Sequence, residues 1–208
     1  MSLEQEIKLV INGMAKLDLT SLSWLTDLAE GEIETKRLTN TYYDTPNLDL
    51  SKHELGLRMR HNGDIWFQTV KTSGSSDNGF HQRDEWEYEL LDENWDLEKL
   101  KQTPLAVMIN DSELWSQLQP VFTTDFIRET MQIILPEGTK IELAYDHGQV
   151  ISGDLAEPIH ELELELKSGS IDQLKQLAAQ FCQRLSVSPS NINKAQRGYE
   201  LASSTKVL

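Results

Sequence analysis

The 208-residue sequence has little that would tie it to a membrane or to an oxidising compartment. Its single cysteine, Cys182, excludes an intrachain disulfide and is typical of proteins in the reducing cytosol. No apolar run approaches the roughly 20 residues that a helix needs to cross a bilayer. The N-terminus also lacks the basic, apolar and small-residue order of a signal peptide. We therefore expect a cytoplasmic protein.

Basic residues are scarce, since 19 Lys and Arg stand against 34 Asp and Glu, which gives a formal net charge of −15. A field of this sign repels nucleic acids and anionic membrane surfaces, so we expect no partner of either kind. The composition still permits a small polyanion held in a locally basic pocket. It leaves the oligomeric state unknown.

Several familiar catalytic arrangements and domain separators are also missing. The five histidines show no zinc-ligand spacing such as HExxH, and no Ser-His-Asp or Cys-His arrangement supports a covalent intermediate. No Pro/Ser-rich linker, low-complexity tract or internal repeat divides the chain. Residues 1–208 are therefore predicted to form one domain.

What the sequence does contain is strand-like alternation of charged and apolar residues. In residues 3–12, Glu4, Glu6 and Lys8 share one face, while Ile7 and Leu9 lie on the other. Further strands are predicted at 32–43, 56–61, 65–72, 80–90, 126–135, 139–146, 149–152 and 159–167.

The remaining segments predict turns and helices. Leucines three residues apart predict an amphipathic helix over 18–30, and His147-Gly148 predicts a turn. Short helices are predicted in 92–120, and longer helices over 171–185 and from about Ser190 onward. About eight strands joined mostly by tight turns favour an α+β protein built on a closed eight-stranded antiparallel β-barrel, with surrounding and C-terminal helices.

The period of two also places ionisable side chains of both signs on single strand faces. Residues 159–167 carry Glu161, Glu163 and Glu165 on one face and leucines on the other. The basic residues at in-phase strand positions, or three apart on the last helix, are Arg58, Arg60, Lys71, Arg83, Arg128, Lys194 and Arg197. Any one such strand is more often a half-exposed strand with a solvated face. Their number in one chain indicates instead a barrel with a charged interior.

A charged interior needs ligands of both signs to be stable. Clustered carboxylates repel one another unless a divalent cation lies between them, and such hard oxygen ligands suit Mg²⁺ or Mn²⁺. Several Arg and Lys side chains aimed into the same space repel likewise unless a polyanion fills it, and guanidinium groups suit phosphate oxygens. A metal ion together with a phosphate chain satisfies both conditions.

Glu4-x-Glu6-x-Lys8 resembles the ExExK signature of the CYTH superfamily, the triphosphate tunnel metalloenzymes. The resemblance extends along the chain through YYDT at 42–45, Arg58-x-Arg60, Lys71, Arg83-x-Glu85, Arg128, Asp146, ELELELK at 161–167 and NKAQRGY at 193–199. Within the superfamily the sequence is most similar to bacterial inorganic triphosphatases. This similarity lies in GFHQR at 79–83, TTDFIRE at 123–129 and AEPIHELELEL at 156–166.

The resemblance implies an enzyme, a metal-dependent inorganic triphosphatase that hydrolyses tripolyphosphate to pyrophosphate and phosphate inside the barrel. It implies catalytic roles for Glu4, Glu6, Lys8 and Asp146. It implies that the phosphate oxygens are bound by Lys8, Arg58, Arg60, Lys71, Arg83, Arg128, Lys194 and Arg197. It implies that Mg²⁺ or Mn²⁺ is bound by Glu4, Glu6, Glu161, Glu163 and Glu165.

Other activities share the same tunnel and stay open. They are class IV adenylate cyclase, thiamine triphosphatase and nucleoside triphosphatases such as the RNA triphosphatase of mRNA capping. A polyphosphate-binding module without turnover is an alternative of a different class. Inorganic triphosphatases of this type commonly continue into a helical CHAD domain, which we do not find within residues 1–208; the sequence is compatible with a stand-alone protein and with a truncated one.

Overall fold

The computed structural model describes residues 1–13 and 15–205. Its strands are β1 (Ser2–Ile11), β2 (Ala29–Asp44), β3 (Leu55–His61), β4 (Trp66–Thr72), β5 (Ser75–Asp77), β6 (Phe80–Leu90), β7 (Gln119–Ile134), β8 (Lys140–Ser152), β9 (Leu155–Ser168) and β10 (Val187–Pro189). Its helices are the 3-10 helix η1 (Leu19–Ser21) and α1 (Ser23–Thr26), α2 (Asp49–Lys52), α3 (Leu97–Leu100), α4 (Ala106–Ile109), α5 (Ser112–Trp115), α6 (Ile171–Arg184) and α7 (Lys194–Thr205).

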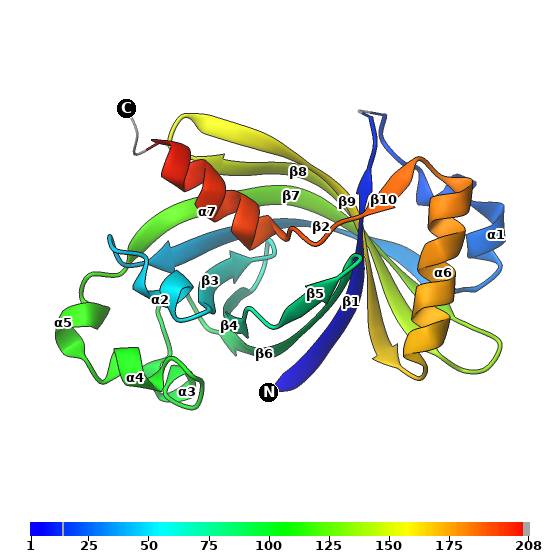
Figure 1. Ribbon diagram of the computed structural model, residues 1–208. Coiled ribbons are helices and arrows are strands. Elements are labelled where there is room, and N and C mark those ends of the chain that lie inside the picture. Colours follow the sequence, from blue (N-terminus) through cyan, green and yellow to red (C-terminus); the bar gives the residue numbers. More distant parts are fainter. Residues whose placement is uncertain (14, 206–208) are drawn as a thin grey trace.

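Eight of the described strands form a closed antiparallel barrel (Figure 1). Their order is β1-β9-β8-β7-β2-β3-β4-β6, and β6 pairs back with β1. Strand β1 closes the barrel because it has two partners: its residues 2–7 pair with β6, and its residues 6–10 pair with β9. The short strands β5 and β10 extend the sheet beside β6 and β1. The predicted fold class is confirmed.

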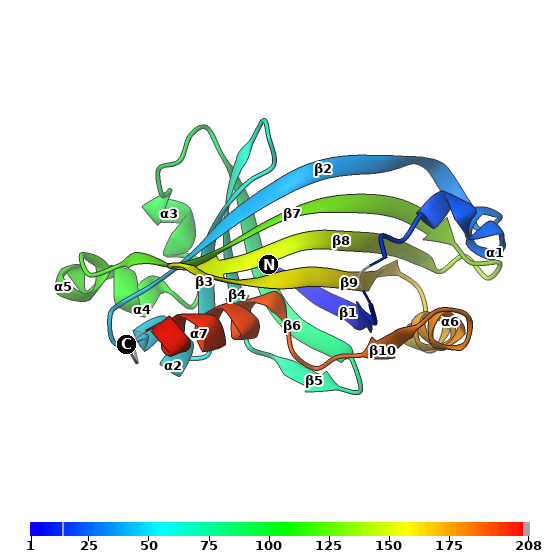
Figure 2. The ribbon, with the colours of Figure 1, turned by 90° about the horizontal axis from the view of Figure 1, so that it is seen from above.

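Most helices lie outside the barrel, whereas α7 borders its interior. Strands β2, β7, β8 and β9 run side by side along most of the molecule, with α6 beside one end and α3, α4 and α5 at the other (Figures 1 and 2). Helix α7 lies across β7, β8 and β9. Within residues 1–13 and 15–205, no helix is both long and apolar enough to span a membrane.

Most of the buried apolar side chains pack against the outer face of the barrel wall. On β1 and β9, Ile7 is paired with Leu164 and Leu9 with Leu162, and all four belong to a buried cluster with Phe181 of α6. A second cluster lies where α3 and α4 meet β3 and β4, and a third lies beneath α7. The first two clusters bury outer strand faces, so the alternate residues on the inner face are free to be charged. The third cluster lies on the inner face, because its members Tyr42 and Phe126 also line the cavity.

The predicted helix over 18–30 is wrong. Leu19, Leu22 and Leu25 are buried, as an amphipathic helix would bury them, but the chain forms only η1 and α1 there. Strand β2 already begins at Ala29, which pairs with Ile133 of β7. Pairing with β7 therefore replaces the second half of the predicted helix.

The predicted turn at His147-Gly148 is also wrong, because β8 continues through both residues. Gly148 is paired with Phe126 on β7, and a Cβ atom added to it would lie 2.4 Å from the Phe126 Cα atom. The glycine thus permits a close approach of two strands rather than a turn. The last helix begins at Lys194 rather than near Ser190, because β10 and a short loop precede it.

Candidate active site in the barrel interior

The barrel encloses a cavity of about 480 Å³. The predicted site residues that line it are Glu4, Glu6, Lys8, Arg58, Arg60, Lys71, Arg83, Arg128, Glu163, Glu165 and Lys194. A second cavity of about 360 Å³ shares Arg60, Glu87, Arg128 and Glu142 with the first, so the two adjoin. The strand pleat thus brings together charged residues from six strands and α7.

Strand register places charged residues directly opposite one another. On β1 and β9, Lys8 is paired with Glu163 and Glu6 with Glu165. On β8, Asp146 is paired with both Glu161 of β9 and Arg128 of β7. Paired residues on neighbouring strands project from the same face, so the alternation in each strand becomes a continuous charged surface in the barrel.

Glu4 and Glu6 of β1 share the guanidinium group of Arg83. The Glu4 carboxylate accepts from Lys71 Nζ at 2.8 Å and from Arg83 Nε at 2.5 Å, and Glu6 accepts from Arg83 at 3.1 Å. Burial opposes ionisation of Glu4, but the charges of Lys71 and Arg83 outweigh it and lower its pKa. Burial and the neighbouring charge of Glu163 raise the pKa of Glu6. The cationic neighbours therefore stabilise the ionised form of Glu4 more than that of Glu6.

Asp146, Glu161 and Glu163 form a carboxylate trio. One oxygen atom from each lies within 4.8 Å of the others. Lys194 Nζ lies among them, at 2.6 Å from Asp146, 2.5 Å from Glu161 and 2.9 Å from Glu163. Burial disfavours a charged Lys194, yet the three carboxylates raise its pKa. A single ammonium from α7 is thus surrounded by three acidic groups.

Two further cations contact the trio. Lys8, which is 1% exposed, donates to Glu161 at 2.9 Å and also to Glu163. Arg128 makes a bidentate contact with Asp146, at 2.7 Å for each hydrogen bond, and donates to Glu163 at 2.5 Å. Burial opposes the charge of Glu163, but its cationic neighbours lower its pKa well below the usual value.

Arg58 and Arg60 share Glu87 of β6. Arg58 lies 3.2 Å from the Glu87 carboxylate and Arg60 lies 3.6 Å from it. Burial, together with the charge of Arg58, lowers the pKa of Arg60 to about 10. Arg60 also donates to Asn40 at 2.7 Å, and Thr69 donates to Glu87 at 2.9 Å. Arg58 also lies 3.5 Å from Glu85, so Glu85 and Glu87 together face the two guanidinium groups.

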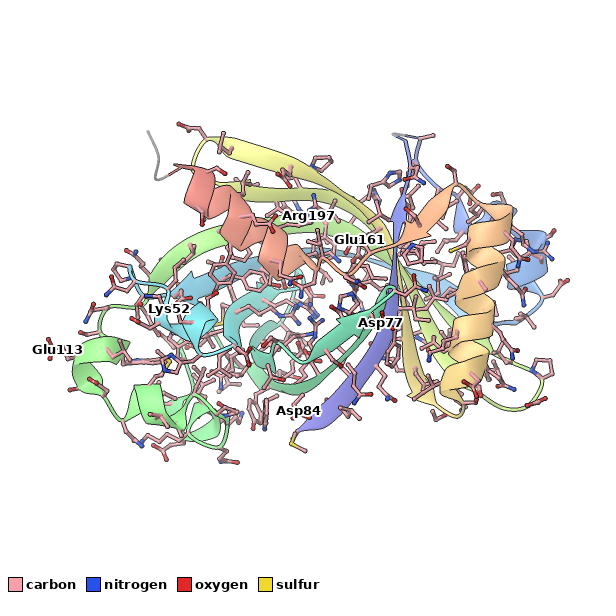
Figure 3. All side chains as sticks on the ribbon, viewed as in Figure 1. Lys52, Asp77, Asp84, Glu113, Glu161 and Arg197 are labelled. Atoms are coloured by element: carbon pink, nitrogen blue, oxygen red, sulfur yellow. The ribbon has the colours of Figure 1, made fainter. Side chains whose placement is uncertain are left out.

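Of the predicted site residues, Asp146, Glu161 and Arg197 line neither cavity, and Glu165 lines the main cavity but is paired with a lysine. Arg197 does not line either cavity: it donates to the Pro158 carbonyl at 2.5 Å, and its guanidinium lies 4.0 Å from Glu161 (Figure 3). Glu165 lines the main cavity but pairs with Lys167 at 2.8 Å, and burial raises the pKa of Glu165.

The predicted metal ligands fall into two sets. Glu161 and Glu163 belong to the trio, whereas Glu4, Glu6 and Glu165 line the cavity outside it. Asp146, predicted as a catalytic residue, is the third member of the trio. Carboxylate oxygens at this spacing fit a hard divalent cation, although Lys194 supplies the positive charge there in this structure. An acidic cluster able to hold a metal ion is thus present.

Sequence reasoning missed several polar residues of the cavity. Glu85 and Glu87 alternate with Arg83 on β6, and the same period of two identifies them once the inward face is known. Asn40 and Thr69 bear no charge, so the search for in-phase ionisable groups passed over them.

Residues 2–199 match the model of the CYTH domain. This chain belongs to the CYTH family. A Haemophilus influenzae protein named inorganic triphosphatase is 34% identical to it over 205 residues, which are 96% of this chain and 55% of that protein. The chain thus spans about half the length of this relative.

Solved structures show the same CYTH fold at lower identity. A Hippeastrum protein, studied as an adenylyl cyclase and described as having a dominant triphosphatase activity, is 18% identical with a TM-score of 0.65, and the match covers 99% of this chain and 97% of that one. A Pyrococcus horikoshii protein is 18% identical with a TM-score of 0.56, covering 95% and 98% of the two chains.

Proposed function

We propose that this CYTH protein is a metal-dependent inorganic triphosphatase that hydrolyses tripolyphosphate to pyrophosphate and phosphate. The observation that carries the proposal is the cavity of about 480 Å³, in which buried Lys and Arg side chains surround space beside a carboxylate trio. The identity to the Haemophilus influenzae protein named inorganic triphosphatase supports the choice of substrate.

Substrate binding is assigned to the cationic residues of the cavity. Arg58 and Arg60 both contact Glu87, and Arg60 has no other carboxylate within 4.0 Å among the described residues, so Arg60 is assigned as a first contact for phosphate oxygens. Lys71, Arg83 and Arg128 are held by carboxylates that fix their direction. Phosphoryl transfer depends chiefly on positioning and charge neutralisation, which preorganised cations supply in a water-poor site.

The metal is assigned to Mg²⁺ or Mn²⁺, with Asp146, Glu161 and Glu163 as the most compact ligand set and Glu4, Glu6 and Glu165 as further candidates. When bound, the ion neutralises phosphate charge and lowers the pKa of a bound water. Lys8 and Arg128 contact the carboxylates from either side, which supports the assignment of the trio as the ligand set. If a divalent ion were bound by the trio, Lys194 would be available to donate to phosphate.

The deciding assay measures phosphate release from tripolyphosphate, ATP and thiamine triphosphate, with Mg²⁺, with Mn²⁺ and with chelator, while ³¹P NMR identifies the products. We expect tripolyphosphate to be the preferred substrate, pyrophosphate and phosphate to be the products, and chelator to abolish turnover. Formation of cyclic AMP from ATP, or tight tripolyphosphate binding without metal-dependent hydrolysis, would overturn the proposal.

A further inference from the structure

We propose that Tyr199 of α7 and Asp44 of β2 form a latch that joins α7 to α2 across the rim of the cavity and thereby positions Lys194. The inference rests on the proposed function, because it takes tripolyphosphate to be the ligand that Lys194 contacts. The rim is defined here by Ser51 and Glu54 on the α2 side and by Asn193 and Gln196 on the α7 side, all of which line the cavity.

Asp44 is the fixed half of the latch. Its side chain is fully buried and accepts hydrogen bonds from the backbone N–H groups of Thr45 at 2.8 Å, Leu50 at 2.9 Å and Ser51 at 3.0 Å. These bonds hold the first turn of α2 against the end of β2. The fourth donor is the Tyr199 hydroxyl at 3.1 Å. The Oδ2 atom of Asp44 accepts from both the Tyr199 hydroxyl and the Ser51 N–H, so loss of the hydroxyl leaves that buried oxygen with one donor instead of two.

Tyr199 is the half of the latch that α7 supplies, and both its ring and its hydroxyl have partners. The ring meets Phe122 edge-on at 5.2 Å between centroids, and Phe122 stacks on Tyr42 at 4.4 Å. Gly198 lets α7 lie directly on Phe122, because an added Cβ atom would lie 2.1 Å from that ring. Burial and the charge of Asp44 raise the pKa of Tyr199, so its hydroxyl stays a donor.

Lys194 lies five residues before Tyr199 on the same helix, and its ammonium group reaches the carboxylate trio. At the start of α7, Asn193 and Gln196 exchange two hydrogen bonds of 2.9 Å, so the first turn is well formed. The helix therefore carries Lys194 and Tyr199 as one body. If the hydroxyl bond to Asp44 is lost, α7 keeps its packing on Phe122 and the contacts of Lys194, but the latched form is less populated and Lys194 is held less firmly in the cavity.

The latch predicts a specific kinetic signature. When the latched form is only partly populated, apparent affinity falls by that fraction, whereas bound tripolyphosphate restores the latched form through its contact with Lys194. A hydrogen bond to a charged acceptor contributes on the order of a tenfold change in an equilibrium. Tyr199→Phe should therefore raise KM for tripolyphosphate about tenfold and leave kcat close to that of the unchanged protein.

The test compares Tyr199→Phe with Ser203→Ala, a matched control on α7 that removes only a hydroxyl bonded within the helix. Hydrogen exchange of the ligand-free proteins reports on α7 and on the Leu50 and Ser51 amides of α2. We expect Tyr199→Phe to accelerate exchange in both helices and to raise KM, and Ser203→Ala to change neither. Asp44→Asn, which replaces one acceptor oxygen with an NH2 group, disturbs the α2 amides directly, so as a second variant it is judged on α7 exchange and KM alone, both of which should change as in Tyr199→Phe.

Unchanged exchange in α2, or an unchanged KM with accelerated exchange in α7 alone, would overturn the latch and leave Tyr199 as a packing residue. The exchange measurement needs no turnover. An inactive unmodified protein would therefore contradict the proposed function, while the coupled exchange of α2 and α7 would still decide for or against the latch.

Discussion

Lys194 of α7 donates to Asp146 of β8 at 2.6 Å, and the Asp146 side chain is fully buried. Residues 48 positions apart in the sequence thus form an ion pair in the barrel interior. Removing one partner of a buried ion pair leaves the other charge uncompensated, which costs far more than the pair itself contributes. The last helix is therefore part of the charge balance of the site.

Lys194→Met should lower the free energy of unfolding by about 3 kcal/mol and reduce kcat/KM for tripolyphosphate about 100-fold. The exposed Lys101→Met, which loses only a surface pair with Glu98, is the matched control and should change neither quantity. Added Mn²⁺ should raise the melting temperature of Lys194→Met more than that of the unmodified protein, because the trio regains a cation. Equal shifts in the two proteins would contradict a metal site at the trio.

Glu163→Gln should weaken Mn²⁺ binding at least tenfold, since it removes one of three converging carboxylates. Isothermal titration of Mn²⁺ into ligand-free protein measures this without any turnover. Glu113→Gln, on the exposed face of α5, is the control (Figure 3). An affinity that is the same in both variants would show that Glu163 is not a ligand.

Arg128→Met and Arg197→Met test, one residue at a time, whether the two arginines predicted to bind phosphate do so. Arg128 lines both cavities, whereas Arg197 lines neither and donates to the Pro158 carbonyl. We expect Arg128→Met to lower kcat/KM about 100-fold and Arg197→Met to lower it less than about fivefold. Steady-state kinetics on tripolyphosphate decides, and equal losses would place Arg197 in the phosphate site after all.

Ionisation of Glu87 should make the free energy of unfolding depend on pH. The charges of Arg58 and Arg60 outweigh its burial and lower the pKa of Glu87 to about 2. Because this folded-state pKa lies below the unfolded value of 4.5, the stabilisation is fully present above the unfolded pKa. It is lost as the pH falls from about 5 toward about 2. Urea unfolding between pH 6 and pH 3 should show a smaller loss of stability for Glu87→Gln than for the unmodified protein; identical slopes would refute the assignment.

Gly148→Ala should destabilise the barrel by about 2 kcal/mol or more. The added methyl group would lie 2.3 Å from the Asp125 carbonyl oxygen, so β7 and β8 would have to separate. Gly56→Ala in β3 is the matched control, because its nearest neighbour would be the Lys71 carbonyl at 4.0 Å. Denaturant unfolding should show the loss in the first variant alone, and equal stabilities would contradict the close approach.

Much of the candidate site could be predicted because strand alternation is a local property. The period of two fixed which of Glu4, Gln5 and Glu6 share a face, whatever the neighbouring strands are. Many strands of this chain carry a charged face, and from this we inferred that the charged faces point into the barrel. The residues that line the cavity agree with that inference. The helix over 18–30 and the turn at 147–148 were missed because pairing with β7, which is remote in sequence, overrides local propensity.

The sequence alone determined the barrel, its charged inner face and the family resemblance, since these depend on residue types at regular spacing. Only the tertiary structure decided which opposite charges meet. Lys194 could have been expected to face the barrel, but its position among Asp146, Glu161 and Glu163 depends on how α7 crosses three strands. The bond between Asp44 and Tyr199 was not predicted, although both residues lie in motifs that resemble the family, because no periodicity pairs two residues that are 155 positions apart.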